Sequence, residues 1–399
     1  MKRNRHFAEF FAGIGLVRKG LESSGWTCVF ANDIDAKKFD TYRANFDHDH
    51  FLLKDIWEVS NSEIPHKCDL FTASFPCVDL SLAGNRKGLA GKESGTLLAF
   101  LEILRVRKKA NNLPSVILLE NVLGFLSSHD GKDFISTAKE LSDLGYFVDA
   151  FTLDARWFTA QSRPRLFVVA SIATNSKDIF VSPSSLFEHR RIVDLGTEEL
   201  RPKKLLQHIY NSPSIRWGQI PLTPPVKSKQ RLHDIVEQME FDDPRWWEQE
   251  KVDYLIKQMS PLHLALIKQA LTSKSDLTGT VYRRVREGKT RAELRTDGIA
   301  GCLRTPRGGS SKQILLTVAK KKVHARWMTP REYARLQGVD DSYNLPDNEI
   351  QAYFGLGDAV CVPAIEWIAR NVLAKIFAST TDKTKQDKPE FLQQIAASA

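Results

Sequence analysis

Short apolar segments alternate with helix-like ones through the first 171 of the 399 residues. Strands and helices that take turns in this way build a largely parallel sheet with helices on both faces. The sequence therefore predicts an α/β fold with a large core. After a first strand from Phe7, the expected strands are 27–31, 51–53, 69–73, 115–122, 146–153 and 166–170, and the expected helices are 16–24, 36–46 and 96–109.

One predicted strand, residues 69–73, ends shortly before Pro76 and Cys77. Proline has no N–H to give to a sheet ladder, so the strand cannot continue through Pro76. Cys77 then lies on a loop at the carboxyl edge of the sheet, where open α/β sheets bind ligands. As a thiolate it would be a strong nucleophile, although a lone cysteine is more often structural.

The first strand runs into a glycine turn at Gly13 and Gly15, and the second is followed by Asp33. Glycines let the backbone approach a ligand, and a carboxylate after the second strand accepts hydrogen bonds from ribose hydroxyls. Two glycines fall short of the full dinucleotide fingerprint. A third acid, Asp55, suits the adenine end of a nucleoside, while any of these acids could instead cap a helix.

Further polar groups are expected at the same edge. Glu120 lies at the end of a core strand. A carboxylate is costly to bury there unless it pairs with a cation or takes part in the function of the protein. Cys77 and Glu120 face one crevice if their strands are neighbours. The segment 161–165 adds Arg163 and Arg165, an arginine pair that can hold a phosphate or a base edge.

Composition narrows the class of protein. Hydrophobic content of 42% and charged content of 26% are those of a soluble globular chain. No apolar run approaches the roughly 20 residues of a membrane helix, and no secretory signal precedes Phe7. Five scattered cysteines without metal-ligand spacing predict a reduced, cytoplasmic setting and no metal site.

The net charge of +9 is unevenly spread. Residues 172–325 hold 27 Lys and Arg against 17 Asp and Glu, and 282–322 alone hold 12 against 3. A basic stripe in an otherwise neutral chain indicates a polyanion partner, and we expect nucleic acid. Because five glycines interrupt 282–322, that segment should form strands and loops, with Arg304 and Arg307 best held for contact.

Taken together, these segments resemble the DNA (cytosine-5)-methyltransferases of bacterial restriction–modification systems. The shared motifs, in the family's order, are Phe11-Ala-Gly-Ile-Gly15, Asn32-Asp33, Phe75-Pro-Cys77, Glu120-Asn-Val122, Gln161-x-Arg-x-Arg165, the segment from Arg326 to Gly338, and Gly355-Leu-Gly-Asp-Ala-Val360. Two positions depart from the pattern, since Leu16 stands where the family usually repeats glycine and Asp358 where it usually has asparagine.

The resemblance implies a Rossmann-like sheet that binds S-adenosylmethionine, with a second, smaller target-recognition domain. Residues 1–171 would form the catalytic domain, 172–322 the DNA-binding target-recognition domain, 323–377 a segment that completes the catalytic domain, and 378–399 a flexible tail. The sequence also predicts one helix over 254–271 in the recognition domain and a helix over 363–377 beside the Phe7 strand.

The resemblance also implies roles for single residues. Cys77 would add to carbon 6 of a flipped-out cytosine, so that carbon 5 becomes able to take a methyl group. Glu120 would hold the N3 edge of the ring, and Arg165, supported by Arg163, would orient the base carbonyl. The implied cofactor contacts are Phe11, Gly13, Ile14, Gly15, Asp33, Ile34, Asp55, Ile56, Pro76, Leu97, Asp358 and Val360. The expected DNA contacts are Ser81, Gln161, Arg304 and Arg307.

Rival interpretations stay open at this point. One is methylation of cytosine in RNA by enzymes with the same motifs, whose Cys-Phe-Thr signature this chain lacks. Others are a DNA-binding protein that has lost catalysis and a nicotinamide dehydrogenase. We expect a monomeric, cytoplasmic bacterial enzyme that acts on double-stranded DNA, with a companion restriction endonuclease as a further partner.

Overall fold

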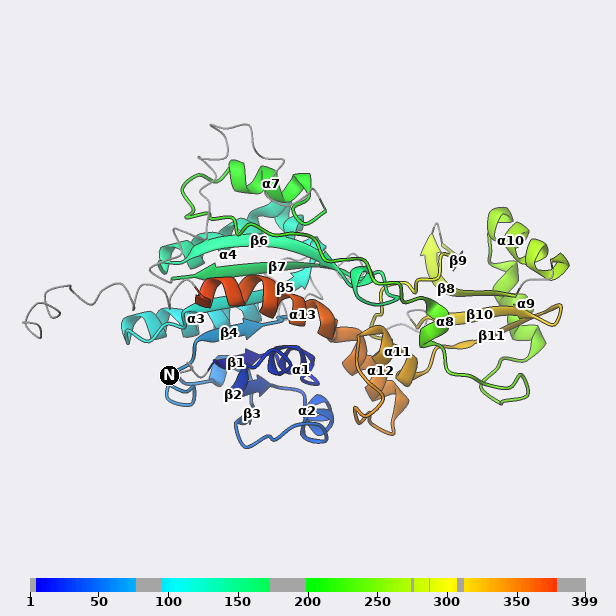
Figure 1. Ribbon diagram of the computed structural model, residues 1–399, viewed down its shortest axis with the longest axis horizontal. Helices are drawn as coiled ribbons and strands as arrows, with labels where there is room; N and C mark the ends of the chain where they lie inside the picture. Colours follow the sequence, from blue (N-terminus) through cyan, green and yellow to red (C-terminus); the bar gives the residue numbers. More distant parts are fainter. Residues whose placement is uncertain are drawn as a thin grey trace, which may run out of the picture.

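The computed structural model describes residues 5–76, 95–172, 199–273, 276–286, 288–306 and 312–378. Figure 1 shows a larger and a smaller body, each built on its own sheet, lying one after the other along the long axis. Cys77, Ser81 and Arg307 lie outside the described residues, as does nearly all of the expected tail.

The larger body is built on a seven-stranded sheet with the order β3-β2-β1-β4-β5-β7-β6. The strands from β1 to β5 pair in parallel, whereas β7 is antiparallel to both β5 and β6. The strand bounds are β1 His6–Phe10, β2 Thr27–Asp33, β3 Phe51–Leu53, β4 Leu70–Ala73, β5 Val116–Val122, β6 Phe147–Asp154 and β7 Pro164–Ser171. These strands confirm the sequence-based prediction of an α/β fold.

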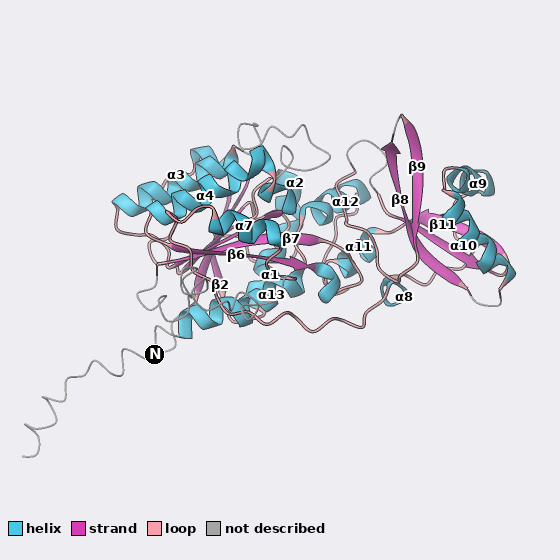
Figure 2. Cartoon of the chain, turned by 90° about the horizontal axis from the view of Figure 1, so that it is seen from above, coloured by secondary structure: helices cyan, strands magenta, loops and turns pink. Residues whose placement is uncertain are grey.

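Helices cover both faces of this sheet (Figure 2). Phe7 of β1 shares a core with α1 and α13, whereas Phe10 of the same strand shares the opposite core with α3 and α4. A strand buried on both faces has to be apolar along its whole length, which explains the continuous apolar runs in the sequence. The helix bounds are α1 Leu16–Glu22, α2 Ala36–Arg43, α3 Thr96–Lys109, α4 Lys132–Asp143, α7 Lys203–Tyr210, α11 Pro330–Leu336, α12 Glu349–Asp358 and α13 Val362–Ile368.

The expected helix over 363–377 is present, although it is not a regular α-helix throughout. Beyond α13 the chain continues helically through a π turn at Ala369–Leu373. Side chains of this stretch join the core that contains Phe7, as expected. Gly20 of α1 makes the close approach possible, because a Cβ there would lie 2.7 Å from Cβ of Ile365.

The smaller body is a four-stranded antiparallel sheet with the order β11-β10-β8-β9. It has its own hydrophobic core, to which Val252, Ile267 and Val281 belong. The described residues of the basic segment 282–322 form strands and loops here, as predicted. The elements are β8 Leu277–Arg286, β9 Lys289–Arg295, β10 Ile314–Ala319, β11 Lys322–Trp327, α9 Gln249–Lys257 and α10 Pro261–Thr272, with the short α8 Leu232–Ile235 on the way to them.

The prediction of one helix over 254–271 is wrong. The chain forms two helices there, because Pro261 occupies the first turn of α10 and the Ser260 side chain caps that helix. Proline suits a helix start but interrupts a helix interior, so the break falls just before it.

The expected change of domain at residue 172 does not coincide with a change in packing. Leu205 and Trp217 lie in the core that contains Phe10, and Val148 of β6 pairs with Trp217. Arg201 forms a buried ion pair with Asp149 of β6 at 2.7 Å. The described residues from 199 to 222 therefore pack on the larger body, and the chain reaches the smaller body only beyond them.

The chain returns to the larger body at α11. Arg326 is still part of β11, and it pairs with Glu332 of α11 through a contact of 2.5 Å. Thr329 and Glu332 form a capping box, and Pro330 occupies the first turn, so this sequence starts a helix strongly. No helix in the described part of the chain is both long and apolar enough to cross a membrane.

Candidate active site

Glu120 and Arg165 lie next to each other at the sheet edge where β4 ends. Because β7 is antiparallel to β5, the start of β7 meets the end of β5, and Val122 pairs with Arg165. Nε of Arg165 lies 3.1 Å from Oε1 of Glu120, and both side chains are largely buried. The structure therefore brings together the carboxylate and the guanidinium that the sequence singled out.

The environment of Glu120 favours its protonated form. Burial raises the pKa of this carboxyl, and Arg165, Arg163 and the Ser74 hydroxyl offset the rise only in part. A protonated carboxyl can donate a hydrogen bond to a ring nitrogen, which a carboxylate cannot. The sequence analysis did not single out Ser74. The feature that could have identified it is its position directly after β4.

The loop that leads to Cys77 starts beside Glu120. Nδ2 of Asn121 donates a hydrogen bond of 3.2 Å to the carbonyl of Phe75, which ties the end of β4 to the end of β5. The Phe75 ring is buried and meets Phe125 edge to face. Pro76, an expected cofactor contact, is the last described residue before the segment that holds Cys77 and Ser81.

The Arg163 side chain is buried near Glu120 and connects several segments of the chain. Its guanidinium donates to the carbonyls of Leu303 at 2.8 Å, Gly357 at 3.0 Å and Ala359 at 2.7 Å. Its backbone N–H donates to the Asp154 carboxylate at 2.8 Å. Arg163 thus joins β7, the segment before β10 and the end of α12.

Cys302 lies in this cluster and was not predicted to be part of it. Its sulfur is 3.6 Å from Nη1 of Arg163. Burial would raise the pKa of this thiol, but Arg163, Arg165 and Arg304 more than offset burial and the pKa is lowered. Nothing near Cys302 in the sequence signals this, because the arginines Arg163 and Arg165 come from another part of the chain.

The structure corrects the expectation for Gln161, whose side chain is fully buried. Its Nε2 donates to the carbonyl of Leu336 at 2.9 Å, and its Oε1 accepts from the backbone N–H of Leu303 at 3.3 Å. An amide used in this way is enclosed in protein and holds segments together, so it is not a DNA contact in this arrangement.

The glycine turn and Asp33 form one unit. Gly13 and Gly15 have φ values of +56° and +80°, in the left-handed region that favours glycine. Oδ2 of Asp33 accepts from the backbone N–H of Gly13 at 2.7 Å, and Oδ1 accepts from that of Asp35 at 2.9 Å. A carboxylate has about four acceptor positions, so Asp33 can still accept from a ribose diol.

Phe11 adopts a backbone conformation that is unusual for its type. Its φ is +58°, which costs a residue with a side chain about 1–2 kcal/mol. Such outliers gather at ligand sites, where the surrounding structure holds them. A phenylalanine that only fills the core would not need a strained backbone. The strain at this position therefore supports the expectation that Phe11 faces the cofactor.

The other expected cofactor residues differ in how far they are exposed. Ile34 is 67% exposed beside Asp33, which suits an apolar wall that a ligand covers. Asp55 caps a single 3-10 turn by accepting from the backbone N–H of Trp57 at 3.0 Å, so its alternative role as a cap is realised. The remaining side chains, which are buried in the cores around the crevice, are Ile14, Ile56, Leu97 and Val360.

Asp358, which departs from the family pattern, has a specific partner. It ends α12, and its Oδ2 lies 2.7 Å from Nζ of Lys38 in α2. The second departure, Leu16, is buried at the start of α1.

A hollow of about 430 Å³ opens on the smaller body next to the arginine cluster. Tyr282, Cys302, Arg304 and Gln313 are among the residues that line it. The exposed Arg304 donates to the Tyr282 hydroxyl at 2.8 Å and lies over the Tyr282 ring. Cys302 lines the hollow and also contacts Arg163, so the hollow adjoins the cluster of Glu120, Arg163 and Arg165.

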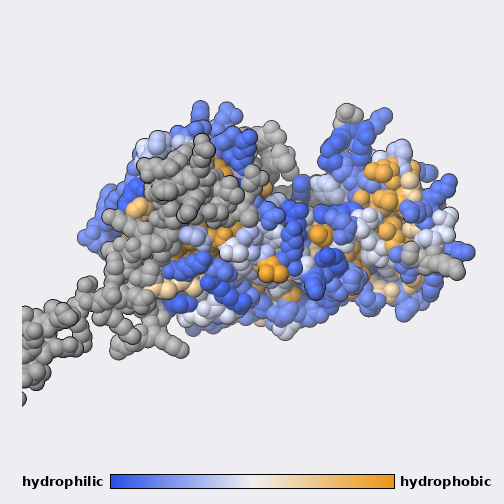
Figure 3. Space-filling model, turned by 45° about the horizontal axis from the view of Figure 1, so that its top comes forward, coloured by the Kyte–Doolittle hydropathy of each residue, from blue (hydrophilic) through white to orange (hydrophobic). Residues whose placement is uncertain are grey.

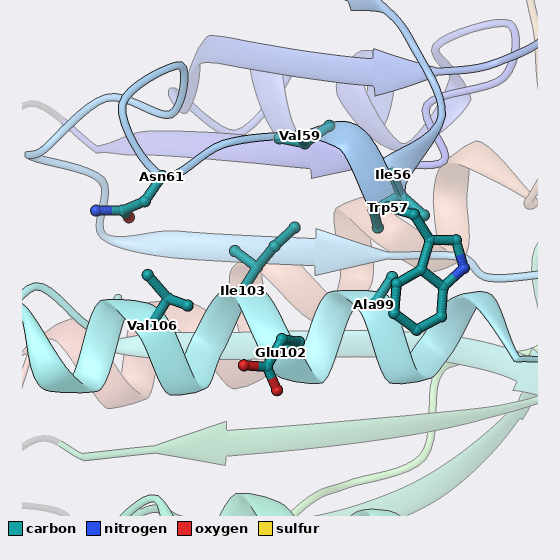
Figure 4. A pocket seen from close by; sticks show the side chains of 8 residues that line it. All are labelled: Ile56, Trp57, Val59, Asn61, Ala99, Glu102, Ile103 and Val106. Carbon is teal, nitrogen blue, oxygen red and sulfur yellow. The ribbon is translucent and has the colours of Figure 1, made fainter.

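Two other surface features lie away from this cluster. A hollow of about 100 Å³ between α3 and the turn at Ile56–Glu58 is lined by Trp57, Ala99 and Val106 among others (Figure 4). Hydrophobic residues also gather on the smaller body (Figure 3), where α10 exposes Leu262 and Leu264. Neither Glu120 nor Arg165 lines these features, and we assign them no role.

Comparison with known proteins identifies the family of the chain. The family model for the C-5 cytosine-specific DNA methylases matches residues 5–374. The Type II methyltransferase M.HpaII of Haemophilus parainfluenzae is 27% identical over 388 residues, 93% of this chain and 89% of that protein. M.HhaI of Haemophilus parahaemolyticus is 25% identical, covering 92% of this chain and 93% of its own.

Solved structures share the fold. The crystal structure of the S. pombe Dnmt2 methyltransferase superposes with a TM-score of 0.59 and 19% identity, covering 94% of this chain and 99% of that one. At that identity the likeness concerns the fold alone. The family model, however, matches residues 5–374, nearly the whole chain. The chain therefore belongs to the C-5 cytosine-specific DNA methylases and is a DNA (cytosine-5)-methyltransferase.

Proposed function

We propose that this enzyme methylates carbon 5 of cytosines within a specific sequence of double-stranded DNA, through a covalent bond between Cys77 and the base. The contact between Glu120 and Arg165 carries this proposal, because it lies beside the start of the loop that leads to Cys77. An acid and a fixed cation at this place can hold the N3 edge and the carbonyl of a cytosine.

In the proposed reaction, the Cys77 thiolate adds to carbon 6 of the ring. Glu120 favours protonation at N3, so the electron pair moves to carbon 5, which becomes nucleophilic enough to take a methyl group. As carbon 5 gains the methyl group, N3 returns its proton to Glu120. A base then removes the carbon 5 proton, the carbon 6–sulfur bond breaks, and Cys77 leaves as a thiolate. The target cannot react inside a stacked duplex, so we propose that it is flipped out.

We propose S-adenosylmethionine as the cofactor, held by Asp33, the Gly13–Gly15 turn and Phe11. The fit rests on the free acceptor positions of Asp33, the strained Phe11 and the exposed Ile34. When bound, the cofactor supplies the methyl group in an electrophilic form. Asp55 and the buried Ile56 would lie at its adenine end, and Pro76, Leu97 and Val360 would form the remaining walls.

We propose that the smaller body recognises the DNA sequence, and that Arg304 and Arg307 contact the duplex. The hollow beside Cys302 supports this, because the exposed Arg304 lines it and Cys302 contacts Arg163. We keep 1–171 with 323–377 as the catalytic part and 378–399 as a tail, and we propose that the described residues 199–222 belong with the catalytic part.

The relatives named Type II methyltransferases suggest a biological role. We propose that the enzyme works in the bacterial cytoplasm as a monomer and protects host DNA from a companion restriction endonuclease with the same site. RNA methylation is the second candidate. The family description favours DNA, and a test on both substrates separates the two.

The decisive experiment combines methyl transfer with trapping of the covalent intermediate. Wild-type enzyme with S-adenosylmethionine should methylate cytosines at one sequence in random DNA, mapped by sequencing, and should not methylate RNA. It should also form a denaturation-resistant adduct with DNA that carries 5-fluorocytosine, because fluorine blocks the final elimination. Cys77→Ser should lose both, whereas Cys302→Ser, the matched cysteine beside Arg163, should still form the adduct. Turnover by Cys77→Ser would overturn the proposed mechanism.

A further inference from the structure

The ion pair between Lys38 and Asp358 joins two segments that are far apart in the sequence. Nζ of Lys38 lies 2.7 Å from Oδ2 of Asp358, with side chains that are 21% and 48% exposed. Figures 1 and 2 both place α2 beside α12. The pair therefore spans the surface between the start of α2 and the end of α12.

The pair lies over the glycine turn. A Cβ on Gly13 would be 4.0 Å from Cδ of Lys38, so the lysine stem passes beside that residue. Gly13 also donates its backbone N–H to Asp33, the proposed ribose contact. On the other side, Arg163 holds the carbonyls of Gly357 and Ala359, the two neighbours of Asp358. The pair thus lies between the proposed ribose site and the catalytic cluster.

Electrostatics shows that the two charges depend on each other. A carboxylate at the last residue of α12 is at the negative end of the helix dipole, where an anion is unfavourable. Burial would lower the pKa of Lys38, but Asp358, Asp33 and Asp35 more than offset burial and the pKa is raised. Asparagine, the usual residue of the family at position 358, is neutral and would not need a lysine to balance its charge.

We propose that Lys38 and Asp358 together recognise the amino-acid end of the cofactor, with the Lys38 ammonium contacting its α-carboxylate and Asp358 its α-ammonium. This inference rests on the proposed cofactor. With the ribose at Asp33, we place the amino-acid end over the adjoining Gly13 turn, beside which the Lys38 stem passes. That end carries one positive and one negative charge, and an opposed pair of charges is complementary to it.

The test compares two ligands that share the adenosine part. S-Adenosylhomocysteine has the charged amino-acid end, and methylthioadenosine lacks it. For Lys38→Met and for Asp358→Asn, calorimetry should show about tenfold weaker binding of S-adenosylhomocysteine, as expected for one lost charge-assisted contact, and less than a twofold change for methylthioadenosine. Lys38→Arg keeps the charge and should retain most of the affinity.

Lys19 provides a matched control. It pairs with Asp340 at 2.8 Å, with similar exposure of 29% and 54%, and likewise joins the first part of the chain to the returning part. Lys19→Met should leave the ratio of the two affinities unchanged. If Lys38→Met left the ratio of the two affinities unchanged, for example by weakening the binding of both ligands equally, the inference would be overturned. Failure of the wild-type enzyme to bind either ligand would instead contradict the proposed cofactor.

Discussion

Nε of Arg165 lies 3.1 Å from Oε1 of Glu120, and this contact exists because β7 runs antiparallel beside β5. A parallel strand at this place would put its carboxyl end, rather than its start, at the active edge. The arginine would then lie at the opposite edge of the sheet. The reversed strand β7 therefore brings Arg165 to the edge of the sheet where Glu120 lies.

The first prediction concerns Glu120. Glu120→Gln cannot pass a proton to N3, so the rate of methyl transfer should fall by about 10²–10⁴-fold. Because burial raises the pKa of this carboxyl, the wild-type rate should fall as the pH rises through that raised value. Single-turnover rates across pH measure both effects, with thermal melting as the check on folding. A Gln variant with full activity would remove Glu120 from the mechanism.

The second prediction concerns Asp33. Asp33→Ala removes the acceptor for the ribose hydroxyls and should weaken cofactor binding by roughly 1.5–3 kcal/mol, about tenfold or more. Calorimetry with S-adenosylhomocysteine measures the change. Asp40→Ala is the control, since Asp40 lies in the following helix and pairs with the exposed Arg43. Unchanged affinity in Asp33→Ala would place the ribose elsewhere.

The third prediction concerns the buried ion pair of Arg326 and Glu332, both with side chains that are 0% exposed. Arg326→Met leaves the Glu332 carboxylate buried without its partner, so the free energy of unfolding should fall by about 3–5 kcal/mol. Urea titrations measure this. The exposed pair of Lys139 and Asp143 is the comparison, and Lys139→Met should cost less than about 1 kcal/mol. Similar losses in both variants would contradict the burial argument.

The fourth prediction concerns Glu9, which is buried in β1 with 1% exposure. Burial raises its pKa from the ordinary 4.5 to about 8, with only partial compensation from Arg18. Between these values the unfolded chain loses a proton that the folded chain keeps. This contribution to stability is complete below pH 4.5 and is lost as the pH rises through about 8.

Glu9→Gln should therefore flatten the pH dependence of stability. Urea unfolding at pH about 5 and about 8.5 should show a smaller loss in the variant than in the wild type. An identical pH dependence in both proteins would show that Glu9 keeps an ordinary pKa when folded.

The fifth prediction concerns Arg304, exposed at the rim of the hollow. If it binds a phosphate, Arg304→Ala should weaken binding to cognate and random duplexes alike and make the salt slope shallower by roughly 0.9. Binding titrations at several salt concentrations measure this, with Arg370→Ala, beyond α13, as the control. A loss on the cognate duplex alone would mean base readout, and no change on either would remove Arg304 from the DNA interface.

The number and order of the strands in the larger sheet follow from the sequence alone. The apolar run that forms β5 predicts a strand, and Pro76 and the glycine turn predict where strands end. These signals are local, because backbone hydrogen bonding and burial on both faces act over a few neighbouring residues. For the same reason, the positions of Glu120, Arg165 and Asp33 beside predicted strands are enough to single them out as site residues.

The tertiary structure decided which of these residues meet. Periodicity does not say that β7 enters antiparallel between β5 and β6, that Gln161 is enclosed beneath the site, or that residues 199–222 return to the larger sheet. Pairs such as Cys302 with Arg163 and Lys38 with Asp358 come from distant segments. Their contacts depend on how whole elements bury their apolar faces against one another, and no local pattern records that arrangement.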